Sequence, residues 1–344
     1  MKKYLYRIFR KNETKLHIPN YIFWECTWRC NLSCLHCGSD CKASSDVKDM
    51  PFEDFLNAIL PLKKVYPKER IVIAITGGEA ILRPDLPECG KKLRQNGFRW
   101  GIVTNGYFYD KEMHSKLLSA GMGAVTLSLD GLKDSHNWLR NNPKSFDKAI
   151  EALKLMVASE RLNYDVVTCV NPQNINELQQ IKDLLISMKV KNWRLFTIDP
   201  IGRAKHQDFQ LTKEQFQNLM DFIVETRKEK RINCYFSCEC YVGNYEFKVR
   251  DASFFCRAGI NIGSVLIDGS ISACPNINRN FVQGNIYKDN FLEVWNSKFD
   301  IFRDRNWCKV GICKDCKSFK DCNGGAMHLW MENQDGILKC FLEN

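Results

Sequence analysis

The sequence lacks long hydrophobic runs, an export signal, internal repeats and low-complexity segments. No apolar stretch approaches the roughly 18 residues that a membrane-spanning helix needs. Residues 1–20 carry several basic side chains but neither a hydrophobic core nor a small-residue cleavage site, which excludes a secretory signal. These absences predict a protein without a membrane span that works in the cytoplasm.

The composition is ordinary for a soluble globular protein. Hydrophobic residues make up 44% and charged residues 26% of the 344 residues. At roughly 150 residues per domain, this length predicts two domains. The 50 Lys and Arg residues outnumber the 40 Asp and Glu residues, which gives a net charge of +10. This excess is spread along the chain and favours an anionic partner, but without a nucleic-acid-binding motif nucleic acid is not expected as that partner.

Cysteine is the abundant residue that needs an explanation. The chain has 17 cysteines, an odd number, and it is neither small nor secreted as disulfide scaffolds are. Most of the cysteines lie in two groups, at 26–41 and at 256–340. Clustered thiols in an intracellular protein are typical of metal binding, so the sequence predicts a metal site near each end of the chain.

Apolar strands alternate with helices through the middle of the chain. One expected helix begins at Pro51 and another ends before Gly121, as helix termini prefer. Near-continuous apolar strands that alternate with helices are typical of a parallel sheet covered by helices. Six such units are fewer than the eight of a closed barrel, so we expect an α/β fold with a partial (β/α)6 TIM-like barrel, whose functional residues lie at the carboxyl ends of the strands. The expected strands are 21–26, 71–76, 100–104, 124–130, 164–170 and 193–198.

The pattern changes after residue 198. Thr212 and Gln215 form a capping box at the start of an amphipathic helix. Asp268-Gly269 predicts a β-hairpin at 265–274. The chain is therefore expected to divide into an N-terminal extension (1–20), a barrel (21–205), a connecting helix and linker (206–250) and a small Cys-rich C-terminal domain (251–344).

A tight group of cysteines follows the first expected strand. Cys30, Cys34 and Cys37 have the spacing Cys-x3-Cys-x2-Cys. Three thiolates can hold three irons of a [4Fe–4S] cluster and leave the fourth iron free to bind a small molecule. A structural zinc site, with Cys26 or Cys41 as its fourth ligand, is the alternative.

Polar residues recur at the ends of the next three strands. The second strand ends in Gly-Gly-Glu at 77–79, where glycines let backbone approach a ligand closely and a carboxylate can bind an ammonium group. Asn105 follows the third strand, Ser128 lies near the end of the fourth, and Arg140 comes after it as a partner for a ligand carboxylate. A simple turn and a surface ion pair are the ordinary alternatives. The recurrence of polar residues at the ends of successive strands, which lie on one edge of the expected barrel, favours a binding site.

With these motifs, the chain resembles the radical S-adenosylmethionine (SAM) superfamily over about 21–203. The resemblance implies a partial (β/α)6 barrel that binds a [4Fe–4S] cluster and SAM, and it identifies no catalytic acid or base. It implies that the cluster is held by Cys30, Cys34 and Cys37, that His36 lies beside the adenine, that Gly77, Gly78 and Glu79 receive the methionine amine, and that Ser128 and Arg140 hold the ribose or carboxylate end, with Asn105 as a weaker candidate on the same rim.

The same resemblance implies the chemistry. The reduced cluster donates one electron to the bound sulfonium, which breaks the C5′–S bond and yields methionine and a 5′-deoxyadenosyl radical. This radical abstracts hydrogen from an unactivated C–H bond, while the protein orients the substrate and excludes water. A flavodoxin or ferredoxin is the expected type of electron donor.

The C-terminal cysteines are similar to those of the SPASM domain, an auxiliary iron–sulfur extension of radical SAM enzymes. The last four, in the pattern Cys-x2-Cys-x5-Cys followed by a distant Cys, imply one auxiliary [4Fe–4S] cluster, and zinc is the alternative. These four cysteines are Cys313, Cys316, Cys322 and Cys340.

A second auxiliary cluster would use Cys256 and Cys274, which flank Gly269 in the pattern Cys-x12-Gly-x4-Cys. By the resemblance, a further ligand of that cluster lies four residues after Cys322, a position that Ala326 occupies here. The second cluster is therefore absent, incompletely ligated, or completed by another cysteine of this region. The candidates are Cys308, Cys238 and Cys240.

Within the SPASM group, the chain is most similar to uncharacterised members encoded beside small lipoproteins or peptides. This implies a peptide or protein substrate. Oxidation of a protein Cys or Ser, as in anaerobic sulfatase maturases, is an alternative, but those enzymes carry an Asp base directly after the Cys equivalent to Cys274, where this chain has Pro275. A non-catalytic iron–sulfur or zinc scaffold is the alternative from a different class, and the intact first motif argues against it.

Overall fold

The computed structural model describes residues 2–66, 71–237, 240–330 and 335–342. The chain forms two compact units. One unit contains residues 1–25, 50–72 and 238–344, and the other contains residues 26–49 and 73–237. Among the described residues, no helix has both the length and the hydrophobicity to cross a membrane.

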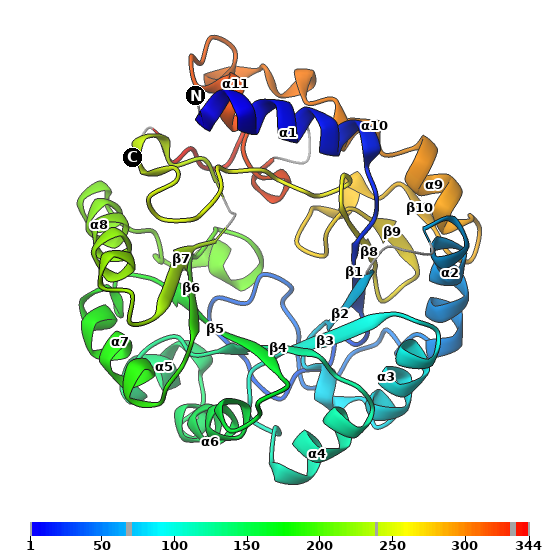
Figure 1. Cartoon of the computed structure of the whole chain (residues 1–344), viewed down its shortest axis with the longest axis horizontal. Helices are drawn as coiled ribbons and strands as arrows, with labels where there is room; N and C mark the ends of the chain where they lie inside the picture. The colour runs from blue at the N-terminus through cyan, green and yellow to red at the C-terminus, as the bar shows by residue number, and fades with distance from the viewer. Residues whose placement is uncertain (1, 67–70, 238–239, 331–334, 343–344) are drawn as a thin grey trace. The chain divides into compact units, whose positions relative to one another are not determined.

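The second unit contains a run of neighbouring strands in the order β2-β3-β4-β5-β6-β7, and the pairs from β3 to β7 are parallel. Helices connect successive strands, and Figure 1 shows α3, α4, α6, α7 and α8 outside the strands, as expected for a partial barrel. The strands are β2 (Val72–Thr76), β3 (Arg99–Thr104), β4 (Ala124–Ser128), β5 (Asn163–Val170), β6 (Asn192–Thr197) and β7 (Asn233–Phe236). The helices are α3 (Leu86–Gln95), α4 (Lys111–Ser119), α5 (Lys133–Arg140), α6 (Ser145–Val157), α7 (Leu178–Ser187) and α8 (Lys213–Glu229).

The α/β fold with a parallel sheet is confirmed, and the strands expected in this unit begin and end within two residues of their expected bounds. The fourth is the least regular, because Leu129 and Asp130 leave the strand that ends at Ser128. β7 lies in a segment expected to be helix and linker. Its four residues are too few to give a clear strand pattern in the sequence.

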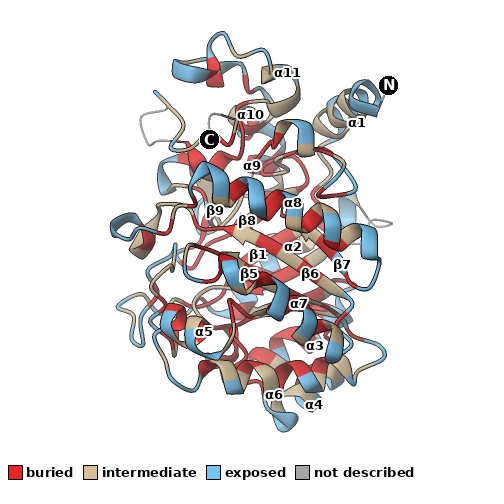
Figure 2. Cartoon of the chain, turned by 90° about the vertical axis from the view of Figure 1, so that its left-hand side faces the viewer, coloured by how far each residue is buried: buried red, intermediate tan, exposed pale blue. Residues whose placement is uncertain are grey.

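Burial explains why these segments form strands and helices. Trp100 on β3 and Trp193 on β6 are almost fully buried. α8 begins with the expected capping box, in which the Thr212 side chain accepts a hydrogen bond from the Gln215 backbone N–H and the Thr212 backbone N–H donates one to the Gln215 side chain. The helix buries one side, which includes Leu219, and leaves the other exposed (Figure 2). This one-sided burial is what the 3.6-residue period of the sequence predicts.

The first unit contains strands in the order β10-β9-β8-β1. β1 pairs with β8 in parallel, and β8 pairs with β9 in an antiparallel hairpin whose turn contains Gly269 at φ +83°. The expected hairpin is therefore confirmed. The elements of this unit are α1 (Lys2–Leu16), β1 (Tyr21–Glu25), α2 (Phe52–Val65), β8 (Ile262–Val265), β9 (Ser270–Ser272), β10 (Gly284–Asn285), α9 (Phe291–Ser297), α10 (Asp300–Arg303) and α11 (Phe319–Cys322).

The N-terminal extension forms a helix, α1, which contacts the segment around α11. The Arg7 guanidinium forms two hydrogen bonds to the Asp321 carboxylate, at 2.6 and 2.9 Å. Arg10 donates to the backbone oxygens of Asp321 and Lys320. α1 has no fully buried residue, so these polar contacts are the main described link between the start of the chain and residues 320–321.

Candidate functional site

The loop after β1 gathers several cysteines in one group. Cys30, Cys34 and Cys41 are buried together, and the partly buried Cys37 packs against them. A hydrogen bond with the Cys41 thiol lowers the pKa of the Cys37 thiol to about 5. Cys26, the other candidate for a fourth zinc ligand, lies outside this group. The structure therefore brings the three motif cysteines together, with Cys41 as a close neighbour.

The two glycines of the Gly-Gly-Glu motif lie directly against the backbone that leads into this loop. A Cβ atom on Gly77 would lie 2.2 Å from the oxygen of Thr27, and one on Gly78 would lie 2.2 Å from the oxygen of Arg29. Gly78 N–H donates to Thr27 O over 2.7 Å, and Glu79 N–H donates to Arg29 O over 2.9 Å. Only glycine permits this approach, so the motif fixes the entry to the cysteine loop.

The Glu79 carboxylate links the ends of β2 and β3. It is almost fully buried and accepts hydrogen bonds from Thr104 Oγ1, from the backbone N–H of Asn105 and from the backbone N–H of Ile81. Burial raises the pKa of this carboxyl group, although the three hydrogen bonds oppose the shift. A ligand ammonium would have to share the carboxylate with these donors.

Two further rim residues direct N–H groups at the cysteine sulfurs. Asn105 Nδ2 lies 4.0 Å from Cys30 Sγ, and Arg140 Nη1 lies 3.7 Å from Cys34 Sγ. Arg140 is buried and its Nε lies 2.6 Å from Asp130 Oδ2. Burial alone would lower the pKa of this guanidinium, but Asp130 and Cys34 raise it. Arg140 therefore stays charged and faces a sulfur atom.

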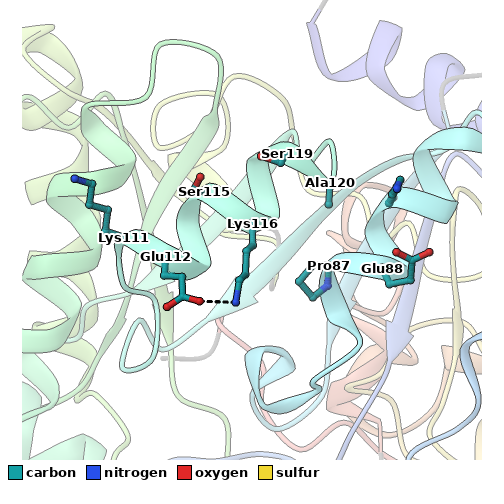
Figure 3. Close-up of a pocket in the computed structure, with 9 residues that line it drawn as sticks. Pro87, Glu88, Lys111, Glu112, Ser115, Lys116, Ser119 and Ala120 are labelled. Atoms are coloured by element: carbon teal, nitrogen blue, oxygen red, sulfur yellow. Dashed lines mark ion pairs between the residues drawn. The ribbon is translucent and has the colours of Figure 1, made fainter.

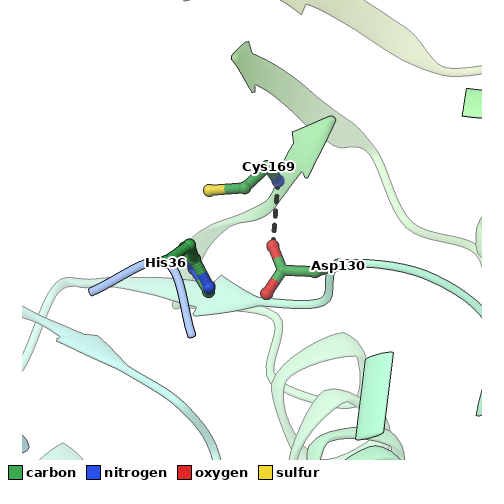
Figure 4. Close-up of side chains that lie close together, drawn as sticks. All are labelled: His36, Asp130 and Cys169. Carbon is green, nitrogen blue, oxygen red and sulfur yellow. Dashed lines mark hydrogen bonds between the residues drawn. The ribbon is translucent and has the colours of Figure 1, made fainter. Parts of the chain in front are cut away.

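His36 lies with Asp130 and Cys169, and their ligand atoms are all within 4.8 Å of one another (Figure 4). Asp130 Oδ1 accepts a hydrogen bond from the Cys169 backbone N–H over 2.8 Å. Burial and the charge on Arg140 lower the pKa of His36 to about 4, so its imidazole is neutral. Burial would raise the pKa of Asp130, but Arg140 lowers it and keeps the carboxylate ionised.

Ser128 and His136 complete the description of the rim. Ser128 is half-buried at the end of β4, two residues before Asp130. His136 Nδ1 accepts a hydrogen bond from the Asp130 backbone N–H, and Nε2 contacts Ser145 Oγ, both over 3.0 Å. Since both ring nitrogens have partners in the chain, His136 stabilises the loop at Asp130 through these hydrogen bonds.

Arg203 is a residue of this site that the sequence did not identify. Its Nε donates to the oxygen of Cys34 over 2.7 Å, and its Nη1 donates to Asp40 Oδ1 over 2.8 Å and to the oxygen of Cys41 over 2.9 Å. Its own backbone N–H donates to Cys37 O over 3.0 Å. The segment 199–203 reads as an ordinary loop in the sequence, and no pattern there indicates contact with the cysteines.

The residues present fit an iron–sulfur cluster with a small polar ligand. Soft thiols form the donor set, and amide and guanidinium N–H groups face two of the sulfurs. Two buried polar atoms beside the cysteines, Asn31 Nδ2 and His36 Nδ1, have no hydrogen-bond partner among the described residues. Buried polar groups are rarely left unpaired, so these atoms indicate a further ligand.

The C-terminal cysteines all lie within the first unit. Burial raises the pKa of Cys322 to about 12, and charges on Cys340, Cys313 and Cys316 contribute, so these three thiols are within electrostatic reach of Cys322. Burial likewise raises the pKa of Cys274 to about 12, with a contribution from Cys256. Cys240 is buried, and Cys238 lies outside the described residues.

A hollow of about 790 Å³ lies elsewhere in the second unit, between α3 and α4 (Figure 3). Charged side chains line it, and two of them, Lys116 and Glu112, form an ion pair at 2.6 Å. None of the expected site residues lines this hollow. It belongs to the outer helical surface and not to the carboxyl ends of the strands.

Comparisons with known proteins identify two domains in the chain. The radical SAM superfamily matches residues 24–185, and the iron–sulfur cluster-binding domain called SPASM matches residues 256–317. The chain is 29% identical over 336 residues to Fe-coproporphyrin III synthase of Methanosarcina barkeri. This alignment covers 88% of this chain and 82% of the relative. It is 28% identical over 334 residues to mycofactocin maturase MftC of Mycolicibacterium smegmatis. That alignment covers 93% of this chain and 81% of the relative.

A solved structure shares the fold. Streptococcus suis SuiB bound to its precursor peptide SuiA superposes with a TM-score of 0.71 at 17% identity, over 97% of this chain and 79% of that chain. The two matched domains imply a [4Fe–4S] cluster that works with SAM, together with auxiliary iron–sulfur clusters. The chain is therefore a radical SAM enzyme with a C-terminal SPASM domain.

Proposed function

We propose that Cys30, Cys34 and Cys37 hold the SAM-binding [4Fe–4S] cluster and that the enzyme modifies a peptide or protein. The observation that carries the cluster assignment is the pair of N–H groups, from Asn105 and Arg140, that face the sulfurs of Cys30 and Cys34. Hydrogen bonds to cluster sulfurs stabilise negative charge and tune the reduction potential.

The residues around the cysteines have distinct roles in this proposal. When bound, the cluster and SAM supply a one-electron cleavage that gives methionine and a 5′-deoxyadenosyl radical. The backbone at 77–79 holds the entry to the cysteine loop and lines the place for the methionine end. His36 Nδ1, buried and without a partner among the described residues, is free to bond a nucleoside. Ser128 and Arg140 are the proposed contacts of the ribose or carboxylate.

The auxiliary cluster is proposed on the quartet Cys313, Cys316, Cys322 and Cys340. Burial is the main cause of the raised pKa of Cys322, and the added effect of charges on Cys340, Cys313 and Cys316 supports this ligand set. The proposed domain division has an N-terminal extension at 1–20, the barrel at 21–205, a connecting helix and linker at 206–250 and the SPASM domain at 251–344. A flavodoxin or ferredoxin is the proposed electron donor, and the cytoplasm the proposed compartment.

The proposed substrate is a peptide or protein. The similarity to mycofactocin maturase MftC supports this class, as does the fold shared with SuiB, whose solved complex contains a precursor peptide. Pro275 follows Cys274 where a sulfatase maturase carries its Asp base, which argues against oxidation of a sulfatase Cys or Ser.

An iron porphyrin is the second candidate substrate. The observation that favours it is the 29% identity to Fe-coproporphyrin III synthase. The net charge of +10 also suits a substrate with several carboxylates. The two candidates share the same cleavage of SAM and differ only in the molecule that loses hydrogen.

Anaerobic SAM cleavage tests the cluster assignment. The protein is reconstituted with iron and sulfide under argon, given SAM and dithionite, and analysed for 5′-deoxyadenosine. We expect Cys34→Ala to abolish the product. The control Cys89→Ala removes a buried thiol that lies on α3, outside the motif, and is expected to retain the activity. Full cleavage by a Cys30/Cys34/Cys37 triple variant would disprove the assignment.

Co-expression with short neighbouring reading frames tests the substrate. A mass change in one encoded peptide that occurs with the wild-type enzyme but not with Cys34→Ala supports peptide modification. If no peptide changes and the reconstituted enzyme instead forms Fe-coproporphyrin III from an iron tetrapyrrole precursor, the tetrapyrrole candidate is correct.

A further inference from the structure

Cys308 is a buried thiol of the SPASM domain that lies outside the Cys-x2-Cys-x5-Cys spacing of the quartet. It ends a short 3-10 turn, Asn306–Cys308, and its exposed fraction is 0%. The sequence leaves open which cysteine, if any, joins Cys256 and Cys274, because the expected position carries Ala326. The surroundings of Cys308 indicate an answer.

Cys308 lies directly on the segment that contains the vacant position. A Cβ atom on Gly324 would lie 2.6 Å from Cys308 Cβ and 2.9 Å from Cys308 Sγ. Gly324 and Gly325 have φ values of +76° and +72°, a conformation that favours glycine. Ala326 follows immediately and is buried. The thiol of Cys308 is therefore held next to the backbone from which a cysteine at 326 would extend.

Arg305 fixes this thiol and supplies a positive charge. Its Nε lies 3.2 Å from Cys308 Sγ, and its Nη2 donates to the oxygens of Gly324 and Gly325, at 3.5 and 3.2 Å. Arg305 is only 4% exposed, and in the described part of the chain it forms no ion pair with a carboxylate. A buried guanidinium needs an anionic partner, and a metal-bound Cys308 thiolate would provide one.

Cys308 also belongs to the same group of thiols as the other two cysteines. Burial raises the pKa of the Cys308 thiol, Arg305 opposes this shift, and a charge on Cys256 adds to it. Cys256 has the same effect on Cys274. Cys256 is thus within electrostatic reach of both thiols, and all three cysteines belong to the first unit.

We propose that Cys308 replaces the cysteine missing at position 326 and, with Cys256 and Cys274, holds a second auxiliary iron–sulfur cluster. Three thiolates bind three irons of a [4Fe–4S] cluster, and a non-cysteine group completes the fourth. This inference rests on the proposed assignment of the quartet to the first auxiliary cluster, and it deepens the proposed function.

Iron and sulfide content tests the proposal on the anaerobically reconstituted full chain. Three clusters give about 12 irons per chain, and we expect Cys308→Ala to retain about 8. Cys234→Ala is the matched control, because Cys234 is also fully buried but lies on β7 in the other unit. It should retain the wild-type content. An unchanged iron content in folded Cys308→Ala would overturn the proposal.

A rescue variant keeps the test independent of folding defects. Adding Ala326→Cys to Cys308→Ala should restore about 4 irons, because the new thiol extends from the same segment. If Cys308→Ala does not fold, Cys308→Ser, which preserves the size of the side chain, replaces it and should change the EPR spectrum of one reduced cluster. An unchanged spectrum, a wild type with about 8 irons, or zinc in place of iron would each contradict the proposal.

SAM cleavage separates this proposal from the proposed function. Cys308→Ala should still form 5′-deoxyadenosine with dithionite, since the SAM-binding cysteines are intact, whereas Cys34→Ala should not. Loss of iron in Cys308→Ala with retained cleavage supports the Cys308 site alone. If Cys34→Ala retains cleavage, the proposed function fails, while the iron count of Cys308→Ala still decides the Cys308 site.

Discussion

Arg203 binds the backbone oxygen of Cys34 through its Nε over 2.7 Å, although 169 positions separate the two residues in the chain. Through the same side chain it also binds the oxygen of Cys41, at 2.9 Å. One guanidinium after β6 therefore holds both ends of the loop that carries Cys34 and Cys37. A cluster site on a loop needs such support, because a loop has few packing contacts of its own to fix its geometry.

Arg203→Gln should leave the fold intact and loosen the cysteine loop. Hydrogen bonds to a charged donor contribute about 1.5–3 kcal/mol each, so losing one net bond of this kind should speed local opening by roughly 10- to 100-fold. The measurement is the rate at which a chelator removes iron from the reconstituted protein. Lys205→Ala, an exposed neighbour in the same 3-10 segment, is the control and should release iron at the wild-type rate.

Gly78→Ala should prevent assembly of the first cluster. The added methyl group would lie 2.2 Å from the oxygen of Arg29, which is backbone and can move only if the loop moves with it. We expect a loss of about 4 irons and of SAM cleavage. Gly123→Ala adds the same methyl group where the nearest atom is 3.8 Å away, so it should behave as wild type. Equal iron contents in the two variants would show that the close approach is unimportant.

The free energy of unfolding should fall on acidification because of His136. Burial lowers the pKa of His136 to about 3 in the folded protein, against about 6.5 in an unfolded chain. Between these two pKa values the unfolded chain binds a proton that the folded chain does not. The contribution of His136 to the free energy of unfolding is therefore fully present above pH ~6.5 and decreases as the pH falls toward the folded pKa. At pH 5 the loss from this group is about 2 kcal/mol.

Urea unfolding of the anaerobic protein at pH 7.5 and pH 5 measures this effect. His136→Gln keeps polar groups near Asp130 and Ser145 but cannot take up the proton, so the difference between the two pH values should shrink by about 2 kcal/mol. His206→Gln, at an exposed position, should not change the difference. An unaltered pH difference in His136→Gln would mean that other groups carry the acid sensitivity.

Cys322→Ala should remove the auxiliary cluster of the quartet without removing the SAM-binding cluster. The variant should lose about 4 irons and still form 5′-deoxyadenosine with dithionite. Product formation on the peptide should fall at least 10-fold if the auxiliary cluster takes part in turnover. Loss of 5′-deoxyadenosine formation as well would indicate that the two proposed sites depend on each other for folding.

Much of the barrel and of the first motif could be predicted from the sequence, because local patterns determine them. Apolar β-branched runs gave the strands, and the spacing of Cys30, Cys34 and Cys37 indicated a loop that can surround a cluster. Capping residues gave the start of α8 at Lys213. These features depend on neighbours in the chain, which the sequence displays directly.

Other features depend on contacts between distant segments, and the sequence does not display them. No local pattern relates Arg203 to Cys34, or Cys308 to the backbone at Gly324. Glu79 illustrates a different limit. A carboxylate at a strand end suggests a ligand contact, yet its described hydrogen bonds all go to the chain, where they fix the ends of β2 and β3.

The contact between Arg7 and Asp321 also bears on the order in which the protein matures. The two residues are 314 positions apart, so a ribosome has made nearly the whole polypeptide before α1 can reach the segment beside Cys322. Before that point, α1 cannot contact the segment at Asp321, and Cys340, the last cysteine of the quartet, has not yet been made. With the proposed ligand sets, iron delivery to the quartet is therefore a late, post-translational event, whereas the loop around Cys34 can receive its iron as soon as Arg203 has emerged.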